Sequence, residues 1–186
     1  MLKLKVNDID AKRCRDFAEA CVDTNIDAYK RRNQGNRDKI IEQIYTGKLG
    51  EFAVHTVLGC GEPDLQIYAK KQKSYSADLI HGGYSIHVKS QSKESSDKYG
   101  TSWSFQIGDK MIVTPKEDDL VALCVQQGVD VQFYGFFPMT VVVPILAEPV
   151  VHQLRHVKRV LYWKDLKFLE ITSTIDMKGV CDGATT

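Results

Sequence analysis

The sequence lacks the long hydrophobic runs and the cysteine pairs that mark membrane and secreted proteins. Its longest apolar stretch, residues 133–150, is interrupted by a glycine and three prolines and is too broken to span a bilayer. The N-terminus alternates leucine with lysine, so no signal peptide is expected. The five cysteines are odd in number and include no C-x-x-C pair, which predicts free thiols in a reducing, cytoplasmic compartment. These absences argue against a disulfide framework and a zinc ribbon, and we expect no membrane partner.

An excess of positive charge is also missing, because the net charge is only +1. The chain therefore carries no global basic signal for nucleic acid. A local basic cluster does occur where the first long helix should end, and it has two interpretations. Its cations can stabilise the negative end of a helix, or they can contact a phosphate backbone. The candidates for phosphate contact, which include one lysine further along the chain, are Arg31, Arg32, Arg37 and Lys48.

Several catalytic signatures are absent as well. The sequence has no P-loop, no dinucleotide-binding glycine motif and no G-x-S-x-G. His152 and His156 are four residues apart and could share a helix face as metal ligands, but no third ligand of matching spacing lies nearby. Two surface histidines explain this spacing better than a metal site does.

The length of 186 residues fits one domain that can bury its own core. We expect an α/β (α+β) fold in which helices flank a central mixed β-sheet. Residues 1–58 should be the helical N-terminal part, residues 76–137 the sheet core and residues 138–177 the C-terminal part of one domain, 1–177. Residues 178–186 are small and polar, so a disordered tail is expected.

Local patterns place the elements along the chain. Apolar residues recur at helical spacing in residues 11–32 and again in residues 37–58, where Thr46-Gly47 could introduce a kink. The uninterrupted apolar run at residues 120–125 is typical of a strand buried on both faces. Polar residues 90–100 indicate a mobile loop. Other predicted elements are strands at 2–6, 101–107, 131–137 and within 154–163, and short helices within 109–119 and at 165–169.

Gly47 and Gly50 stand in the second helical segment, where glycine is costly. Small residues there indicate that something packs or binds close to the backbone beside Glu51. A loose join between two helices, with Glu51 in solvent, is the alternative.

The stretch from Ser76 to Ser92 organises the rest of the chain because it has the pattern of a β-hairpin. Gly82-Gly83 lies between two alternating apolar runs. Such a pair predicts a two-residue turn, in which His81 is opposite Tyr84. The polar residues of the second strand then fall on one face and the apolar residues on the other.

This register pairs Asp78 with His87 and places Leu79 and Ile86 on a core face. A slip by one residue would move Asp78 to the core face. An aspartate opposite a histidine, with a lysine two residues further, can hold a cation beside a general base. A solvated outer face needs no such function. The residues expected on this exposed face are Asp78, His87, Lys89 and Gln91.

The order of these elements resembles the PD-(D/E)XK nuclease superfamily, the fold of many restriction endonucleases. The family has an acidic residue on the first core helix, an aspartate at the start of a hairpin, and (D/E)-x-K on its second strand. Here G-K-L-G-E supplies Glu51, S-A-D-L supplies Asp78, and H-V-K-S-Q supplies Lys89 and Gln91. The resemblance covers roughly residues 40–137 and implies a restriction-endonuclease-like core.

His87 stands where the family usually has a carboxylate. The resemblance implies a divalent metal held by Asp78, Glu51, His87 and the carbonyl of Val88. Mg²⁺ prefers oxygen ligands and Mn²⁺ tolerates nitrogen better, so either ion is a candidate cofactor. Alternatively, His87 acts as a base, or the site has lost the metal. Pro63-Asp64 is a literal P-D and a lower-ranked alternative to Asp78.

The function that the resemblance implies is a metal-dependent DNA endonuclease of the restriction or phage-nuclease type. It would cut double-stranded DNA, and we expect a homodimer because two strands must be cut. Lys89 would stabilise negative charge on the attacking hydroxide or the phosphorus, and Gln91 would orient water or contact phosphate. The alternatives are a catalytically degenerate DNA-binding or assembly protein on the same fold, and a structural partner protein.

Overall fold

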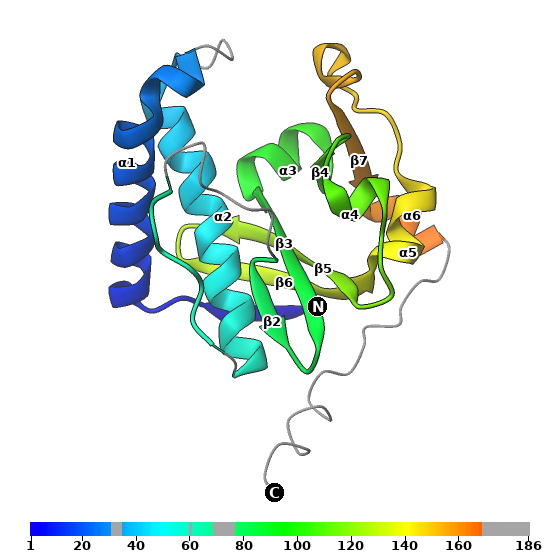
Figure 1. The fold of residues 1–186 in the computed structure, drawn as a ribbon, viewed down its shortest axis with the longest axis horizontal. Helices are drawn as coiled ribbons and strands as arrows, with labels where there is room; N and C mark the ends of the chain where they lie inside the picture. The colour runs from blue at the N-terminus through cyan, green and yellow to red at the C-terminus, as the bar shows by residue number, and fades with distance from the viewer. Residues whose placement is uncertain (31–34, 60, 69–76, 169–186) are drawn as a thin grey trace, which may run out of the picture.

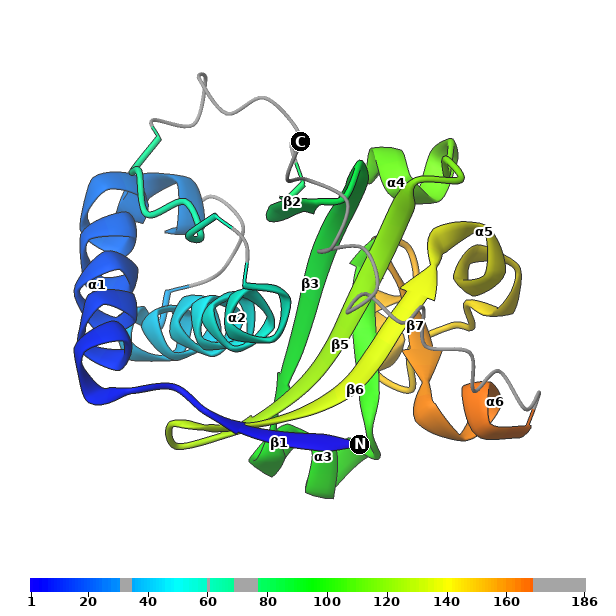
Figure 2. The same cartoon turned by 90° about the horizontal axis from the view of Figure 1, so that it is seen from below.

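A mixed β-sheet forms the centre of the structure, and further layers cover both of its faces (Figures 1 and 2). The computed structural model describes residues 1–30, 35–59, 61–68 and 77–168. The strands are β1 (Leu2–Lys5), β2 (Leu79–His81), β3 (Tyr84–Ser92), β4 (Ser102–Gln106), β5 (Asp119–Gln127), β6 (Asp130–Pro138) and β7 (Lys158–Tyr162). The helices are α1 (Asp8–Lys30), α2 (Arg37–Leu58), α3 (Lys93–Tyr99), α4 (Lys110–Val113), α5 (Met139–Val142) and α6 (Trp163–Phe168), with short 3-10 turns at Val143–Ile145 and His152–Leu154.

The five-stranded sheet has the order β1-β6-β5-β3-β2. β3 and β5 are parallel and the other neighbours are antiparallel, so the sheet is mixed and the predicted α+β class is confirmed. Parallel neighbours need a long crossover, and here it consists of α3, β4 and α4. β4 leaves the main sheet and pairs with β7 in a separate two-stranded sheet. No helix in the described part of the chain is long and apolar enough to cross a membrane.

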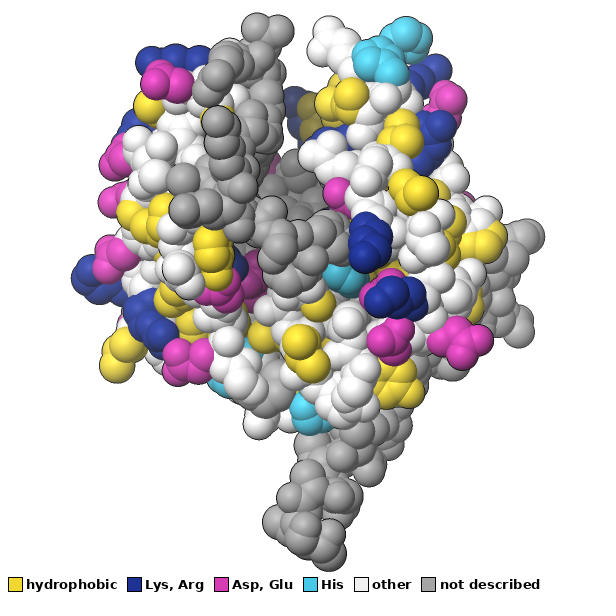
Figure 3. Space-filling model, viewed as in Figure 1, with side chains coloured by type: hydrophobic (Ala, Val, Ile, Leu, Met, Phe, Trp, Pro, Cys, Tyr) yellow, Lys and Arg dark blue, Asp and Glu magenta, His cyan; other side chains and the backbone are white. Residues whose placement is uncertain are grey.

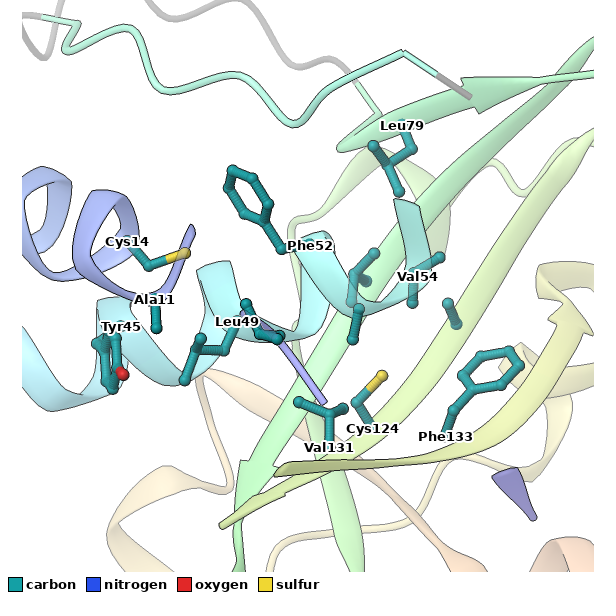
Figure 4. Close-up of a cluster of buried hydrophobic side chains, with 14 of the residues drawn as sticks. Ala11, Cys14, Tyr45, Leu49, Phe52, Val54, Leu79, Cys124, Val131 and Phe133 are labelled. Carbon is teal, nitrogen blue, oxygen red and sulfur yellow. The ribbon is translucent and has the colours of Figure 1, made fainter. Parts of the chain in front are cut away.

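α1 and α2 lie together on one side of the main sheet, whereas the β4–β7 sheet, α5 and α6 lie on the other (Figure 2). Asn36 caps α2 by accepting a hydrogen bond from the amide of Lys39, and Gly59 ends the helix in the left-handed conformation. Figure 4 shows side chains of α2 between α1 and the sheet, with Leu49 and Phe52 among them. Both helices occur where the sequence predicted them.

Because layers cover both faces of the sheet, the buried apolar side chains in the described part of the chain form two hydrophobic clusters. Alternate residues of β5 enter the cluster under the helices (Leu120, Ala122, Cys124) and the cluster under the β4–β7 sheet (Val121, Leu123, Val125). The predicted strand buried on both faces is therefore confirmed. Trp103 is fully buried in the second cluster, and its indole Nε1 donates a hydrogen bond to the carbonyl of Cys124 at 2.7 Å.

Two expectations about the hairpin and its sequel are wrong. The face of β3 that carries His87 and Lys89 is not open to solvent, because the second sheet covers it. Their neighbours on β5, Val121 and Leu123, belong to the hydrophobic cluster under that sheet. Residues 90–100 are not a mobile loop: β3 continues to Ser92, which then caps α3. The polar residues in this stretch include the Ser92 cap and an ion pair between Lys93 and Asp97 on α3, which the composition alone did not indicate.

The thiols follow the sequence prediction within the described residues. Among the described residues, Cys14, Cys21 and Cys124 form no disulfide. Burial raises the pKa of Cys14 to about 12, so this thiol stays protonated at neutral pH. Cys60 and Cys181 lie outside the described residues, as does the tail 178–186.

Gly50 lies at a close contact between α2 and β3. A Cβ on Gly50 would be 1.9 Å from Ser90 Oγ and 3.3 Å from Val88 Cγ1, whereas a Cβ on Gly47 would meet no described residue within 4 Å. The close packing expected at these glycines is therefore confirmed at Gly50. α2 is uninterrupted through Thr46-Gly47, so the loose helix join is wrong.

These two glycines give opposite predictions for stability. Gly47→Ala should raise the free energy of unfolding by about 0.5–1 kcal/mol, because alanine favours the helix. Gly50→Ala should lower it by about 1–3 kcal/mol, because the methyl group overpacks against β3. Urea unfolding measures both, and adding Ser90→Ala to Gly50→Ala should recover part of the loss. An equal gain in both single variants would contradict the close approach.

Candidate active site

The hairpin has the predicted register at its turn. His81 pairs with Tyr84 and Leu79 with Ile86. Gly82-Gly83 forms the turn with positive φ at both residues, which glycine adopts without strain. The Gly82-Gly83 pair therefore sets the hairpin register, and the register decides which residues of β3 face the helices.

Asp78 is held differently from the prediction. Its expected ladder pair with His87 is absent because β2 begins one residue later. The Oδ2 atom of Asp78 instead accepts a hydrogen bond from the amide of Val88 at 2.8 Å, and the amide of Asp78 donates to the carbonyl of Ile86 at 3.0 Å. These bonds fix the carboxylate beside the outer edge of β3.

The carbonyl of Val88 lies at the same edge. The N–H and C=O of one strand residue point to the same side, and the Val88 amide points to Asp78. Among the described residues, β2 pairs with β3 only as far as Ile86. The backbone carbonyl expected as a metal ligand therefore lies beyond the paired part of the edge, next to the carboxylate of Asp78.

Glu51 reaches this region because of its neighbour Gly50. The close approach of α2 at Gly50 brings the helix onto the Val88 and Ser90 side of β3. Glu51 is only 8 % exposed. Its Oε2 atom forms an ion pair with Lys48 Nζ at 2.6 Å, so the buried carboxylate has the charged partner that burial demands.

Lys48 does not project into solvent as a phosphate-binding lysine would. Its Nζ also donates to the carbonyl of Asp64 at 2.9 Å and lies 4.9 Å from the centroid of the Phe17 ring. The side chain is 14 % exposed. Lys48 therefore joins α2 to the segment after it and balances the charge of Glu51.

Glu51, Asp78, Asp64 and Lys48 all line one cavity of about 350 Å³. The structure thus brings together the two carboxylates that the sequence singled out, and it adds the lower-ranked Asp64. The carboxylate of Asp64 is engaged by its own loop: Oδ1 accepts from the amide of Gln66 at 2.7 Å and Oδ2 from the hydroxyl of Tyr68 at 2.8 Å. Asp78 and Glu51 are therefore better candidates than Asp64 for binding a metal ion in this cavity.

The described residues contain no cluster of three or more His, Cys, Asp or Glu that could hold a metal ion by themselves. Mg²⁺ does not require one, since it is commonly bound through one or two carboxylates together with waters and substrate phosphates. Two carboxylates and the carbonyl of Val88 are oxygen donors of this kind. The residues present therefore fit a hydrated Mg²⁺ or Mn²⁺ and not a fully enclosed metal centre.

His87 is on the opposite face of β3 from Glu51 and does not line the cavity. It is 4 % exposed, and its Nε2 lies 3.8 Å from Asp119 Oδ1. Burial lowers the pKa of His87, while the carboxylates of Asp78 and Asp119 partly oppose the effect. The structure therefore places a neutral imidazole beside Asp119 and leaves the expected contribution of His87 to the Asp78–Glu51 set without support.

Lys89 shares the face of His87. Its Nζ lies 4.0 Å from Asp109 Oδ2 and 5.4 Å from the centroid of the Phe105 ring. Lys158 adds a second ammonium: burial lowers its pKa, the charge of Lys89 lowers it further, and Asp109 opposes both. The sequence pattern did not reveal Asp109 or Lys158, because β4, β7 and α4 come together only in the folded chain.

Gln91 is occupied by the backbone. Its Oε1 accepts from the amide of Ser102 at 2.9 Å, and its Nε2 donates to the carbonyl of Gly100 at 3.1 Å. It fixes the turn between α3 and β4. The expected role in orienting water or phosphate gains no support from these contacts.

The expected DNA contacts are also changed by the fold. Arg37 forms hydrogen bonds with both carboxylate oxygens of Asp23, at 2.8–3.1 Å, and ties α2 to α1. Arg31 and Arg32 lie outside the described residues. Over α1, basic and acidic side chains are interspersed (Figure 3). Ion pairs such as Lys12–Asp16 account for this pattern.

Comparisons with known proteins do not identify a family for this cavity. No family model, curated protein or solved structure matches the chain. Any function assigned to the cavity is therefore inferred from its own chemistry and from the resemblance of its motifs.

The site can be divided by the strand on which it is built. On one side of β3, between α2 and the outer edge of the strand, lie the carboxylates of Glu51 and Asp78 and the ammonium of Lys48. The other side holds Lys89 and Lys158 around Asp109, next to the His87–Asp119 pair. Asp78 stands at the edge between them, and its charge acts on His87 across the strand. Carboxylates for a cation and ammonium groups for an anion are thus present at one edge of the sheet.

Proposed function

We propose that the chain is a metal-dependent DNA endonuclease of the restriction or phage-nuclease type, acting on double-stranded DNA as a homodimer. The observation that supports this most is the shared cavity of Glu51 and Asp78. These residues come from separate elements, and both were singled out by their resemblance to the PD-(D/E)XK pattern. They line one cavity, and Asp78 is bonded there to the amide of Val88, beyond the part of β3 that pairs with β2.

Glu51, Asp78 and the carbonyl of Val88 would hold Mg²⁺ or Mn²⁺. When bound, such an ion lowers the pKa of a coordinated water and withdraws negative charge from a phosphate. The chain itself keeps the Asp78 carboxylate oriented through the Val88 amide. Lys48 balances Glu51, so the cavity is not left with two uncompensated carboxylates.

The two lysines on the other side of β3 would act on the phosphate. Asp109 holds Lys89 at the strand, and Lys158 supplies a second ammonium group nearby. A fixed ammonium group stabilises negative charge that develops on the phosphate in the transition state. The neutral His87 keeps this side from accumulating a further cation.

A second candidate, a DNA-binding protein that does not cut, is favoured by one observation. The ammonium of Lys48 already supplies a cation to Glu51 at 2.6 Å. A lysine in that place can substitute for a metal ion, and a carboxylate is missing at position 87. Metal binding separates the two candidates.

The experiment is cleavage of supercoiled plasmid and linear duplex DNA with Mg²⁺, Mn²⁺ or EDTA. Lys89→Ala is expected to lower the cleavage rate by about a hundredfold. Lys93→Ala, an exposed lysine on the following helix, should cleave like wild type. Calorimetric titration with each metal is the second measurement. Absence of both cleavage and metal binding would contradict the nuclease and support the non-cutting protein.

A further inference from the structure

A second and larger cavity lies away from the Glu51–Asp78 site, between the end of α3, the segment at residues 148–150, and the junction of β7 with α6. Its volume is about 680 Å³, within the range of small-molecule sites. The hydroxyl of Tyr162 holds the segment in place by accepting from the amide of Val150 at 3.1 Å and donating to the carbonyl of Glu148 at 3.2 Å. The two cavities share none of the described residues that line them.

The charged groups of this cavity are mainly cations. Arg155 lies 3.6 Å from Glu148 and also donates from Nε to the carbonyl of Pro149 at 3.2 Å. Within the described residues, its two terminal nitrogens have no hydrogen-bond partner, and no carboxylate lies within ion-pair distance of Lys164 or Lys167. Among the residues that the structure describes, Arg155 and Glu148 form the pair inside the cavity, and the ammonium groups of Lys164 and Lys167 stay exposed. The cavity therefore favours an anion.

Aromatic rings line the same cavity. Tyr99 is 46 % exposed at the end of α3, and Tyr162 and Trp163 contribute from the β7–α6 junction. Lys164 Nζ lies 5.5 Å from the centroid of the Tyr162 ring. Rings beside cations are the combination by which proteins stack bases and bind the phosphates attached to them. A simple phosphate would not need an exposed ring, and a neutral aromatic molecule would not need unpaired lysines.

We propose that this cavity binds a nucleotide unit, with the base stacked on Tyr99 and the phosphate held by Lys164, Lys167 and the free nitrogens of Arg155. The unit is either a free nucleotide or one nucleotide of a single strand, because both offer the same base and phosphate. The site goes beyond the proposed cleavage site and does not depend on it.

Binding is tested in EDTA, so that no cleavage can contribute. The probes are thymidine 5′-monophosphate and a fluorescein-labelled oligothymidylate of about twelve nucleotides. Fluorescence anisotropy reports the oligonucleotide. Quenching of intrinsic fluorescence reports both probes, because Trp163 lines the cavity whereas Trp103 is buried.

Charge reversal tests the phosphate contacts. Lys164→Glu combined with Lys167→Glu is expected to weaken binding by about tenfold or more and to reduce its salt dependence. Lys3→Glu combined with Lys12→Glu makes the same charge change at exposed residues outside the cavity and should change the affinity less than about twofold. Equal affinity in the two double variants would overturn the site.

Substitution of Tyr99 tests the stacking. Tyr99→Ala should weaken binding, whereas Tyr99→Phe keeps the ring and should bind like wild type. Saturable binding of the monophosphate, with the same sensitivity to the variants, assigns the site to a free nucleotide. Binding of the oligonucleotide alone assigns it to a single strand. Failure of both probes to bind or to quench would overturn the proposal whatever the cleavage assay shows.

Discussion

Replacing Asp78 with asparagine is expected to reduce metal-dependent DNA cleavage by at least about a hundredfold while leaving the protein folded. Asparagine has the same shape, and its Oδ1 can still accept the hydrogen bond from the amide of Val88 that positions the native side chain. Only the charge that would bind the metal is lost. A metal ligand contributes several kcal/mol of charge stabilisation, and every 1.36 kcal/mol is about tenfold in rate.

Asp64→Asn is the matched control for this substitution. Asp64 lines the same cavity, but Gln66 and Tyr68 already engage its carboxylate. Cleavage by this variant should therefore stay close to wild type. The reverse result, with activity lost in Asp64→Asn and kept in Asp78→Asn, would identify the literal Pro63-Asp64 as the catalytic acid and show that the site assignment is wrong.

Calorimetry separates metal binding from chemistry in the same variants. Asp78→Asn and Glu51→Gln should each weaken the binding of Mg²⁺, because each removes one of the two carboxylates proposed to hold the ion. Glu51→Gln should also lower stability, since the largely buried ammonium of Lys48 then lacks its negatively charged partner. Unfolding curves in urea measure that second effect.

The sequence predicted local features of the site because local chemistry determines them. Gly82-Gly83 sets the hairpin register, and the helical spacing of apolar residues sets α1 and α2. Gly50 also indicated a close contact, because glycine destabilises the interior of a helix and is expected there only where another element packs against the backbone. These features together bring Glu51 on α2 and the start of the hairpin into one region.

The surroundings of His87 could not be predicted in the same way. Alternation along β3 shows that His87 and Lys89 share a face, but it does not show what covers that face. The cover is the pairing of β4 with β7, which joins segments far apart in the chain and buries Trp103 and Phe105. Such non-local packing turns a face that looks solvated in the sequence into a largely buried one. Lys158 on β7 and Asp109 just before α4 belong to the same covering layer.

His87→Asp is the substitution for which the sequence and the structure give opposite predictions. By resemblance, an aspartate restores the family carboxylate and should preserve or raise activity with Mg²⁺. In the structure, it places a second carboxylate in a buried position facing Asp119. We expect His87→Asp to lower the free energy of unfolding by about 3–5 kcal/mol at pH 8, because a buried charge is left uncompensated. His156→Asp makes the same change at an exposed position and should have little effect.

The pH dependence of stability identifies the cause. Burial lowers the pKa of His87, with Asp78 and Asp119 opposing it and Lys89 adding to it. The unfolded chain then binds more protons than the folded chain near the ordinary pKa of about 6.5. The stability that wild type gains from the neutral imidazole is present above about pH 6.5 and is lost as the pH falls through the folded-state value.

The His87→Asp variant should show the opposite slope. Of the two facing carboxyl groups, one is forced to hold a proton, so its folded-state pKa rises above the unfolded value of about 3.9. The variant should therefore recover stability relative to wild type as the pH falls from 8 to about 5. Urea unfolding of wild type, His87→Asp and His87→Gln across this range measures the difference, and His87→Gln should remove the histidine contribution without adding a carboxyl. If the free energy of unfolding depended on pH in the same way for wild type and His87→Asp, position 87 would be more open to solvent than the fold implies. That result would again support His87 as a metal ligand, the role that the resemblance implies.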